Sequence, residues 1–154
     1  MVGITTIMSS MTHLPDGIIL FAHGSRDPHW RGPIEAVAAR IRAEYPEQPV
    51  VCAYLELCEP SLPDAAALMI SQLQIAINSI AFCADSMPAK GTKPLKIRIF
   101  PMFLGMGKHA REDLPELASE LRAAHPGVVF EITSTVGEDS RVTALLAQIA
   151  IGSV

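Results

Sequence analysis

This chain contains four short, largely apolar runs, and each run is followed by a stretch in which apolar positions recur at helical spacing. The runs cover residues 17–22, 50–57, 95–102 and 128–135. The first run is continuous, which is typical of a strand buried on both faces of a parallel sheet. The stretches that follow place apolar side chains on one helical face. The pattern therefore predicts strands and helices in the order βαβαβαβα.

Helix start and stop signals support this order. Residues 27–28, Asp and Pro, predict the cap and first turn of the first helix. Residues 61–64 predict an equivalent start for the second helix, which we expect to run to about Ala81. Residues 113–116 resemble a capping box at the start of the third helix. Three helix breakers within residues 84–94 predict a loop there.

Elements of these lengths predict one α/β domain, built as a doubly wound, four-stranded parallel sheet with helices on both faces. The flavodoxin-like strand order 2-1-3-4 fits four units best. We assign residues 17–154 to this domain and residues 1–16 to a flexible leader. In this order strands 2, 1 and 3 are neighbours, so the residues at their carboxyl ends are expected to meet at one edge of the sheet.

Three residues with metal-binding side chains stand at those carboxyl ends. His23 follows the first strand, Glu56 ends the second, and His109 follows the third. Two imidazoles and a carboxylate form a mixed site suited to Co²⁺, Fe²⁺, Ni²⁺ or Zn²⁺. In the alternative interpretation, the histidines bind loop backbone and Glu56 pairs with an arginine.

The two histidine loops, residues 21–26 and 103–109, supply further candidate contacts. Basic side chains could meet ligand carboxylates, glycines let a ligand approach the backbone, and apolar side chains could form a wall against a flat ligand. A solvated loop face and an ordinary core remain the alternatives. The expected ligand-contacting residues are Ser25, Arg26, Phe103, Leu104, Gly105, Met106, Gly107, Lys108 and Arg111.

Composition narrows the functional classes. A net charge of −4 argues against a general nucleic-acid binder. Three cysteines without CxxC spacing argue against a disulfide framework and favour a reducing cytoplasm. We find neither a signal peptide nor an apolar run of the roughly 20 residues that a membrane span needs. The 49% hydrophobic content reflects either a rich core or a surface covered by a partner chain.

Taken together and in order, residues 22–28, 54–62, 101–115 and 136–139 resemble a known family. The chain is similar to the short CbiX-type sirohydrochlorin chelatases of the class II chelatase superfamily, from about Gly17 to its end. One difference is the segment 82–94, which is longer than the corresponding family turn. It could cover a cleft, contact a partner or be a surface insertion.

This resemblance implies a lyase that inserts a divalent metal into sirohydrochlorin, in cobalamin or siroheme synthesis, without a nucleotide. The metal is a substrate, with Co²⁺ expected first and Fe²⁺ or Ni²⁺ as alternatives. His23 and His109 match the family's metal-binding and proton-handling histidines, and Glu56 matches its acidic partner. Short members correspond to half of a two-lobed chelatase, which implies a homodimer.

Two other functions remain open from the sequence. The same residues could serve a metal or tetrapyrrole carrier that has no turnover. An apolar-His-Gly sequence after a strand also occurs in the oxyanion loops of α/β hydrolases. The chain has no GxSxG nucleophile elbow, however, and Ser25 has no evident triad.

Overall fold

The computed structural model describes residues 14–83 and 93–152, with the backbone alone at residues 81–83 and 109. The predicted leader and the segment 82–94 thus lie largely outside the described residues. Within these residues, four strands and four α-helices alternate, with two short 3₁₀ helices, η1 and η2. Their order is β1 (Gly17–Ala22), η1 (Pro28–Arg31), α1 (Gly32–Glu44), β2 (Val50–Tyr54), α2 (Leu62–Cys83), β3 (Leu95–Pro101), α3 (Lys108–Ala124), β4 (Val128–Ile132), η2 (Val136–Glu138) and α4 (Ser140–Ile151).

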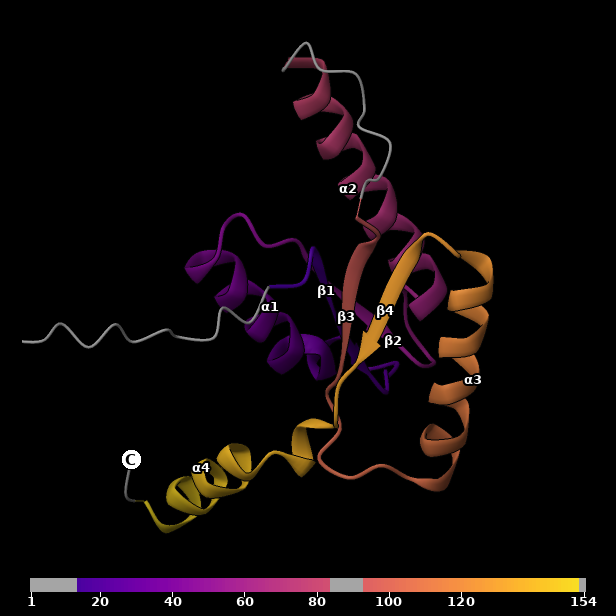
Figure 1. Cartoon of the computed structure of the whole chain (residues 1–154). Coiled ribbons are helices and arrows are strands. Elements are labelled where there is room, and N and C mark those ends of the chain that lie inside the picture. The colour runs from indigo at the N-terminus through magenta and orange to yellow at the C-terminus, as the bar shows by residue number, and fades with distance from the viewer. Residues whose placement is uncertain (1–13, 84–92, 153–154) are drawn as a thin grey trace, which may run out of the picture.

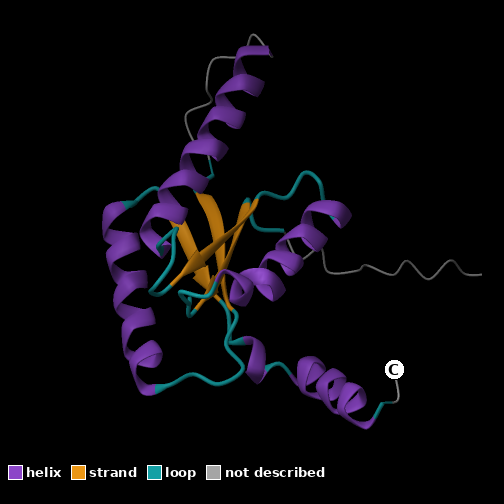
Figure 2. Ribbon diagram, turned by 180° about the vertical axis from the view of Figure 1, so that it is seen from behind, coloured by secondary structure: helices purple, strands orange, loops and turns teal. Residues whose placement is uncertain are grey.

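The strands form one parallel sheet in the order β2-β1-β3-β4, which confirms the predicted topology. Side chains alternate between its two faces. On one face, Ile19, Phe21 and Ile97 are fully or almost fully buried beneath α2 and α3. On the other, Leu20 and Val50 pack against α1. The two apolar layers account for the continuous apolar run of β1, and Figures 1 and 2 show helices on both sides of the sheet.

The last helix, α4, does not join either layer. It projects away from the sheet in both views, and its main contacts are with η2 (Figures 1 and 2). None of its residues is buried. The helix lies where the sequence pattern predicted one, but its apolar face lacks the cover that the pattern led us to expect.

The element ends differ from the prediction where local hydrogen bonds decide them. β2 ends at Tyr54, so Glu56 lies in a turn and not in the strand. The predicted start of the third helix at residues 113–116 is wrong. α3 begins at Lys108, because Arg111 N–H donates to the Gly107 carbonyl at 3.1 Å and closes the first turn there. Residues 27–28 introduce the 3₁₀ helix η1, which precedes α1.

Candidate functional site

The carboxyl edge of the sheet brings His23 and Glu56 together. His23 follows β1 directly, and its Nδ1 lies 3.5 Å from Oε1 of Glu56. Beyond the end of β2, Leu55 N–H still donates to the Ala22 carbonyl at 2.9 Å, and Glu56 N–H donates to the His23 carbonyl at 3.0 Å. These bonds hold the two turns side by side. The side chains are 51% and 54% exposed, so both can reach a ligand from solvent.

Gly24 makes this close approach possible. Its φ is +98°, and a Cβ at this position would lie 1.8 Å from the Glu56 carbonyl oxygen. Only glycine fits both the backbone angle and the space. Leu57 also has a positive φ, of 65°, in the turn that carries Glu56. A tight backbone contact therefore sets the position of the His23–Glu56 pair.

The loop after β3 lies next to the His23 turn. Met102 N–H donates to the Phe21 carbonyl at 2.7 Å, two residues before His23. Phe103 is 6% exposed and packs edge-on against Phe21, with ring centroids 5.8 Å apart. Leu104, in contrast, is 68% exposed. Phe103 thus anchors the loop from below, and Leu104 is free to contact a ligand.

His109 is the second residue of α3, at the end of this same loop. Its side chain lies outside the described part of the structure. That His109 lies close to His23 therefore stays a prediction. Among the side chains that are described, no third His, Cys, Asp or Glu joins His23 and Glu56 in a metal-sized cluster. The ion-pair partner of Glu56 in this part of the chain is His23 and not an arginine.

The three loop glycines differ in backbone conformation and surroundings. Of Gly24, Gly105 and Gly107, only Gly24 has a positive φ. A Cβ at either Gly105 or Gly107 would meet nothing within 4 Å. These two positions therefore present bare backbone to open space, which a flat ligand could approach.

A shallow pocket of about 300 Å³ lies beside this loop. Arg111 borders it and donates from Nη2 to the Met106 carbonyl at 3.0 Å. Gly137 N–H donates to the Phe103 carbonyl at 3.0 Å and ties η2 to the loop. The lining residues are Leu104, Gly105, Met106, Arg111, Thr135, Gly137 and Glu138. The site prediction missed the last three, although residues 136–139 were part of the family resemblance.

The remaining predicted contacts lie on the exposed rim of the two loops. The Ser25 hydroxyl accepts a hydrogen bond from Asp27 N–H at 3.1 Å, so it shapes the turn. Arg26 is exposed. Lys108 Nζ lies 3.9 Å from Glu112 Oε1 with its side chain 83% exposed, a loose pair that leaves the ammonium available.

A family model matches residues 17–151 of this chain and bears the description CbiX. The chain belongs to the CbiX family. The match spans all four strands and both loops of the candidate site, so it confirms the family resemblance drawn from the sequence.

Relatives of this CbiX protein are named as chelatases. The chain is 28% identical over 122 residues to the chloroplastic sirohydrochlorin ferrochelatase of Arabidopsis thaliana, a match that covers 79% of this chain and 45% of the relative. It is 31% identical over 101 residues to the sirohydrochlorin cobaltochelatase of Methanothermobacter thermautotrophicus, covering 66% and 56%. The chain thus spans about half the length of these curated relatives.

Among solved structures, a CbiX protein from Marinobacter aquaeolei VT8 is similar in fold and size. It superposes with a TM-score of 0.65 and 27% identity, and the match covers 90% of this chain and 96% of that one. Within the described residues, no helix combines the length and apolar character that a membrane crossing requires.

Proposed function

We propose that this protein is a sirohydrochlorin chelatase, a lyase that inserts a divalent metal into the macrocycle. One observation supports it above the rest: in a CbiX-family chain, His23 and Glu56 meet at 3.5 Å beside the loop that leads to His109. The metal is a substrate, with Co²⁺ expected first and Fe²⁺ or Ni²⁺ as alternatives. The names of the two relatives support both a cobalt and an iron substrate.

The chemistry suits a sparse, exposed set of ligands. The metal must shed water and then pass to the macrocycle, so a closed four-ligand cage would hold it too firmly. One imidazole and one carboxylate, both about half exposed, offer few bonds to break. Metal insertion also removes two protons from the pyrrole nitrogens, and a neutral histidine is a suitable acceptor near pH 7. We assign these tasks to His23, Glu56 and His109 together.

The loop between β3 and α3 is the proposed binding surface for the macrocycle. The exposed Leu104 and the half-buried Met106 offer an apolar wall, and the open backbone at Gly105 and Gly107 allows close approach. The carboxylates of sirohydrochlorin would meet the cations on the rim, namely Arg26, Lys108 and Arg111. Ser25 and Phe103 support the two loops through the contacts described above.

We further propose that the chain works as a homodimer in the cytoplasm, without a nucleotide. The family resemblance supports pairing of two copies, because short members correspond to half of a two-lobed chelatase. The free thiols of Cys52 and Cys58 agree with a reducing compartment.

Turnover of metal and sirohydrochlorin tests this proposal. The protein is mixed anaerobically with an excess of sirohydrochlorin and Co²⁺, and metallation is followed by absorbance. We expect many equivalents of product per chain, above the spontaneous rate. Product that stops at one equivalent per chain would instead indicate a carrier. Parallel reactions with Fe²⁺ and Ni²⁺ rank the metals.

Glu56→Gln and Glu116→Gln form a matched pair for the same assay. Both remove one carboxylate charge, but Glu116 lies on the exposed face of α3. We expect turnover to fall at least tenfold in Glu56→Gln and to stay unchanged in Glu116→Gln. Equal rates in the two variants would contradict the role of Glu56.

A further inference from the structure

Helix α4 has the composition of a buried helix and the position of an exposed one. After Arg141, residues 142–151 carry no charged side chain. Helices that lack charge on every side are normally buried. Here no α4 residue is buried, and Figure 2 shows the helix extended away from the body of the protein. Its large exposed apolar residues are Leu145 (48%), Leu146 (45%), Ile149 (56%) and Ile151 (81%).

The sheet has a matching uncovered area, which we call the open strip. It is the face of β3 and β4 opposite α2 and α3, where α1 does not reach because it packs mainly on β1 and β2. Val129 on this strip is 47% exposed, and Phe100 is half-buried. The residues of the open strip are Lys96, Arg98, Phe100, Val129, Glu131 and Thr133.

The charges of the open strip are paired with one another. Arg98 Nε donates to Glu131 Oε2 at 2.9 Å, and Lys96 Nζ lies 3.3 Å from the same oxygen. The Arg98 bond, with Lys96 nearby, lowers the pKa of Glu131. The strip can therefore accept an uncharged helix without leaving a lone carboxylate beneath it. In doubly wound folds, a helix covers each such half of a sheet face.

The chain's own α4 is held away from its own strip. Thr135 and Glu138 form a capping box in η2: Thr135 N–H donates to the Glu138 carboxylate at 3.0 Å, and the Thr135 side chain accepts from Glu138 N–H. Glu138 N–H also donates to the Thr135 carbonyl at 3.0 Å. Gly137 is tied to the Phe103 carbonyl, and Asp139 accepts from Arg141 N–H at 2.8 Å to cap α4. These contacts set the direction in which α4 leaves the sheet.

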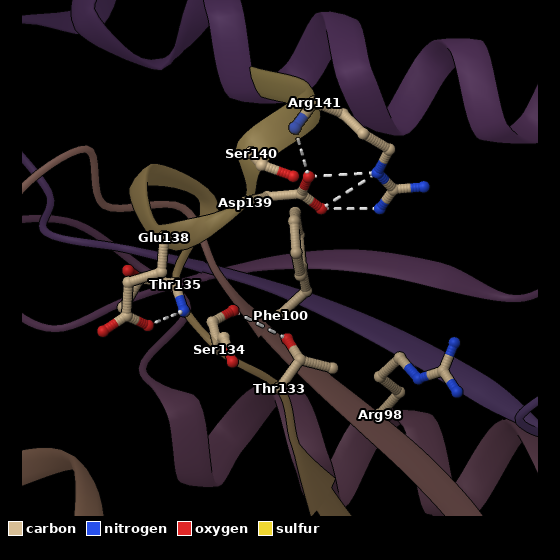
Figure 3. Close-up of a pocket in the computed structure, with 9 residues that line it drawn as sticks. All are labelled: Arg98, Phe100, Thr133, Ser134, Thr135, Glu138, Asp139, Ser140 and Arg141. Atoms are coloured by element: carbon tan, nitrogen blue, oxygen red, sulfur yellow. Dashed lines mark hydrogen bonds and ion pairs between the residues drawn. The ribbon is translucent and has the colours of Figure 1, made fainter. Parts of the chain in front are cut away.

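A hollow of about 550 Å³ opens where α4 departs (Figure 3). Arg98, Phe100 and Thr133 line it from the open strip, and residues 138–141 line it from the start of α4. Figure 3 shows Asp139 and Arg141 paired on the α4 side, with Phe100 projecting between the two sides. The hollow separates the start of α4 from the open strip, so α4 does not pack on the strip of its own chain.

We propose that two copies of this chain exchange their α4 helices, so that each helix covers the open strip of the other copy. This inference rests on the homodimer in the proposed function and names its interface. A second copy is the occupant because one chain holds both complementary parts, and the η2 contacts keep them apart in that chain. Exchange of an identical element is a common route to closed dimers.

The exchanged helix would adjoin the candidate site. Thr135 and Glu138 line both the hollow at α4 and the pocket beside the β3–α3 loop. Each copy would thus contribute structure near the macrocycle pocket of the other.

Cross-linking between differently tagged copies tests the exchange. One copy carries Val129→Cys, and the other carries Leu145→Cys, Leu146→Cys or Ile149→Cys. The two tagged variants are mixed and mildly oxidised. Wild-type protein treated in the same way shows the cross-links that the native cysteines form. We expect a disulfide that joins the two tags at one or more α4 positions. A variant that carries both cysteines in one chain provides the counter-test. A disulfide formed within that chain would overturn the exchange, because α4 would then fold back onto its own open strip.

A charge on α4 provides the second test. Leu146→Lys should halve the apparent mass measured by light scattering, with circular dichroism unchanged because the side chain is exposed within one chain. Ile77→Lys is the matched control, an exposed isoleucine on α2 (44%). Dissociation by Ile77→Lys alone would overturn the α4 interface and leave the dimer standing. A monomeric wild type would overturn both the exchange and the proposed homodimer.

Discussion

Replacing Gly24 by alanine should disrupt the backbone contact that places Glu56 beside His23. The new methyl carbon would lie 1.8 Å from the Glu56 carbonyl oxygen, whereas real Cβ contacts are essentially never under 3.0 Å. One of the two turns must therefore move by more than about 1 Å. Because the side chains of His23 and Glu56 extend from these turns, their 3.5 Å separation should be lost.

Two costs add up in Gly24→Ala. A left-handed backbone costs a non-glycine residue about 1–2 kcal/mol, and φ is +98° here. Forcing extra atoms into a tight contact typically costs about 1–3 kcal/mol. We therefore expect the free energy of unfolding to fall by about 2–5 kcal/mol. The variant should remain folded, since small domains have about 5–15 kcal/mol of stability.

Urea unfolding followed by circular dichroism measures this loss, and Gly105→Ala is the matched control. Gly105 has no positive φ, and a methyl group added there would have nothing within 4 Å. We expect its unfolding free energy to stay the same or to rise by up to about 1 kcal/mol. Metallation activity should fall in Gly24→Ala. Equal stability of the two variants would refute the role of the Gly24–Glu56 contact.

Three further predictions concern Tyr54, Ile99 and Gly137. Burial raises the pKa of Tyr54 from 10.0 to about 12, so its contribution to stability is complete below pH 10 and is lost as pH rises through about 12. Tyrosinate absorbance of wild type minus Tyr54→Phe measures this midpoint, and a value near 10 would contradict it. Ile99→Ala, at a fully buried core position, should lower the unfolding free energy by about 2–5 kcal/mol in urea titrations. Gly137→Ala would place a methyl group 1.9 Å from the Leu104 carbonyl oxygen; we expect a lower thermal midpoint and weaker sirohydrochlorin binding.

The sheet could be predicted from the sequence because the signal that defines it is local. A strand buried on both faces needs a continuous apolar run, and residues 17–22 show it plainly. The strand order 2-1-3-4 followed from the alternation of strands and helices, and the structure confirms it. The meeting of His23 and Glu56 was a consequence of that order.

What the sequence did not reveal depends on contacts between distant segments. The carbonyl that starts α3 belongs to Gly107, and no side chain marks it as a cap, whereas residues 113–116 carry a capping pattern inside the helix. Gly24 and Gly137 look alike in sequence to Gly105, yet only the first two meet a distant backbone oxygen. Helical periodicity likewise identifies the apolar face of α4 and cannot say which chain covers it.

The central claim is that His23 and His109 handle the metal and the pyrrole protons during insertion. The most direct measurement is the initial rate of anaerobic Co²⁺ insertion into sirohydrochlorin for His23→Ala, His109→Ala and the control His125→Ala, which removes an imidazole at the far end of α3. We predict that the first two variants lose at least about tenfold in rate and that His125→Ala keeps the wild-type rate. Wild-type rates in both His23→Ala and His109→Ala would contradict the account.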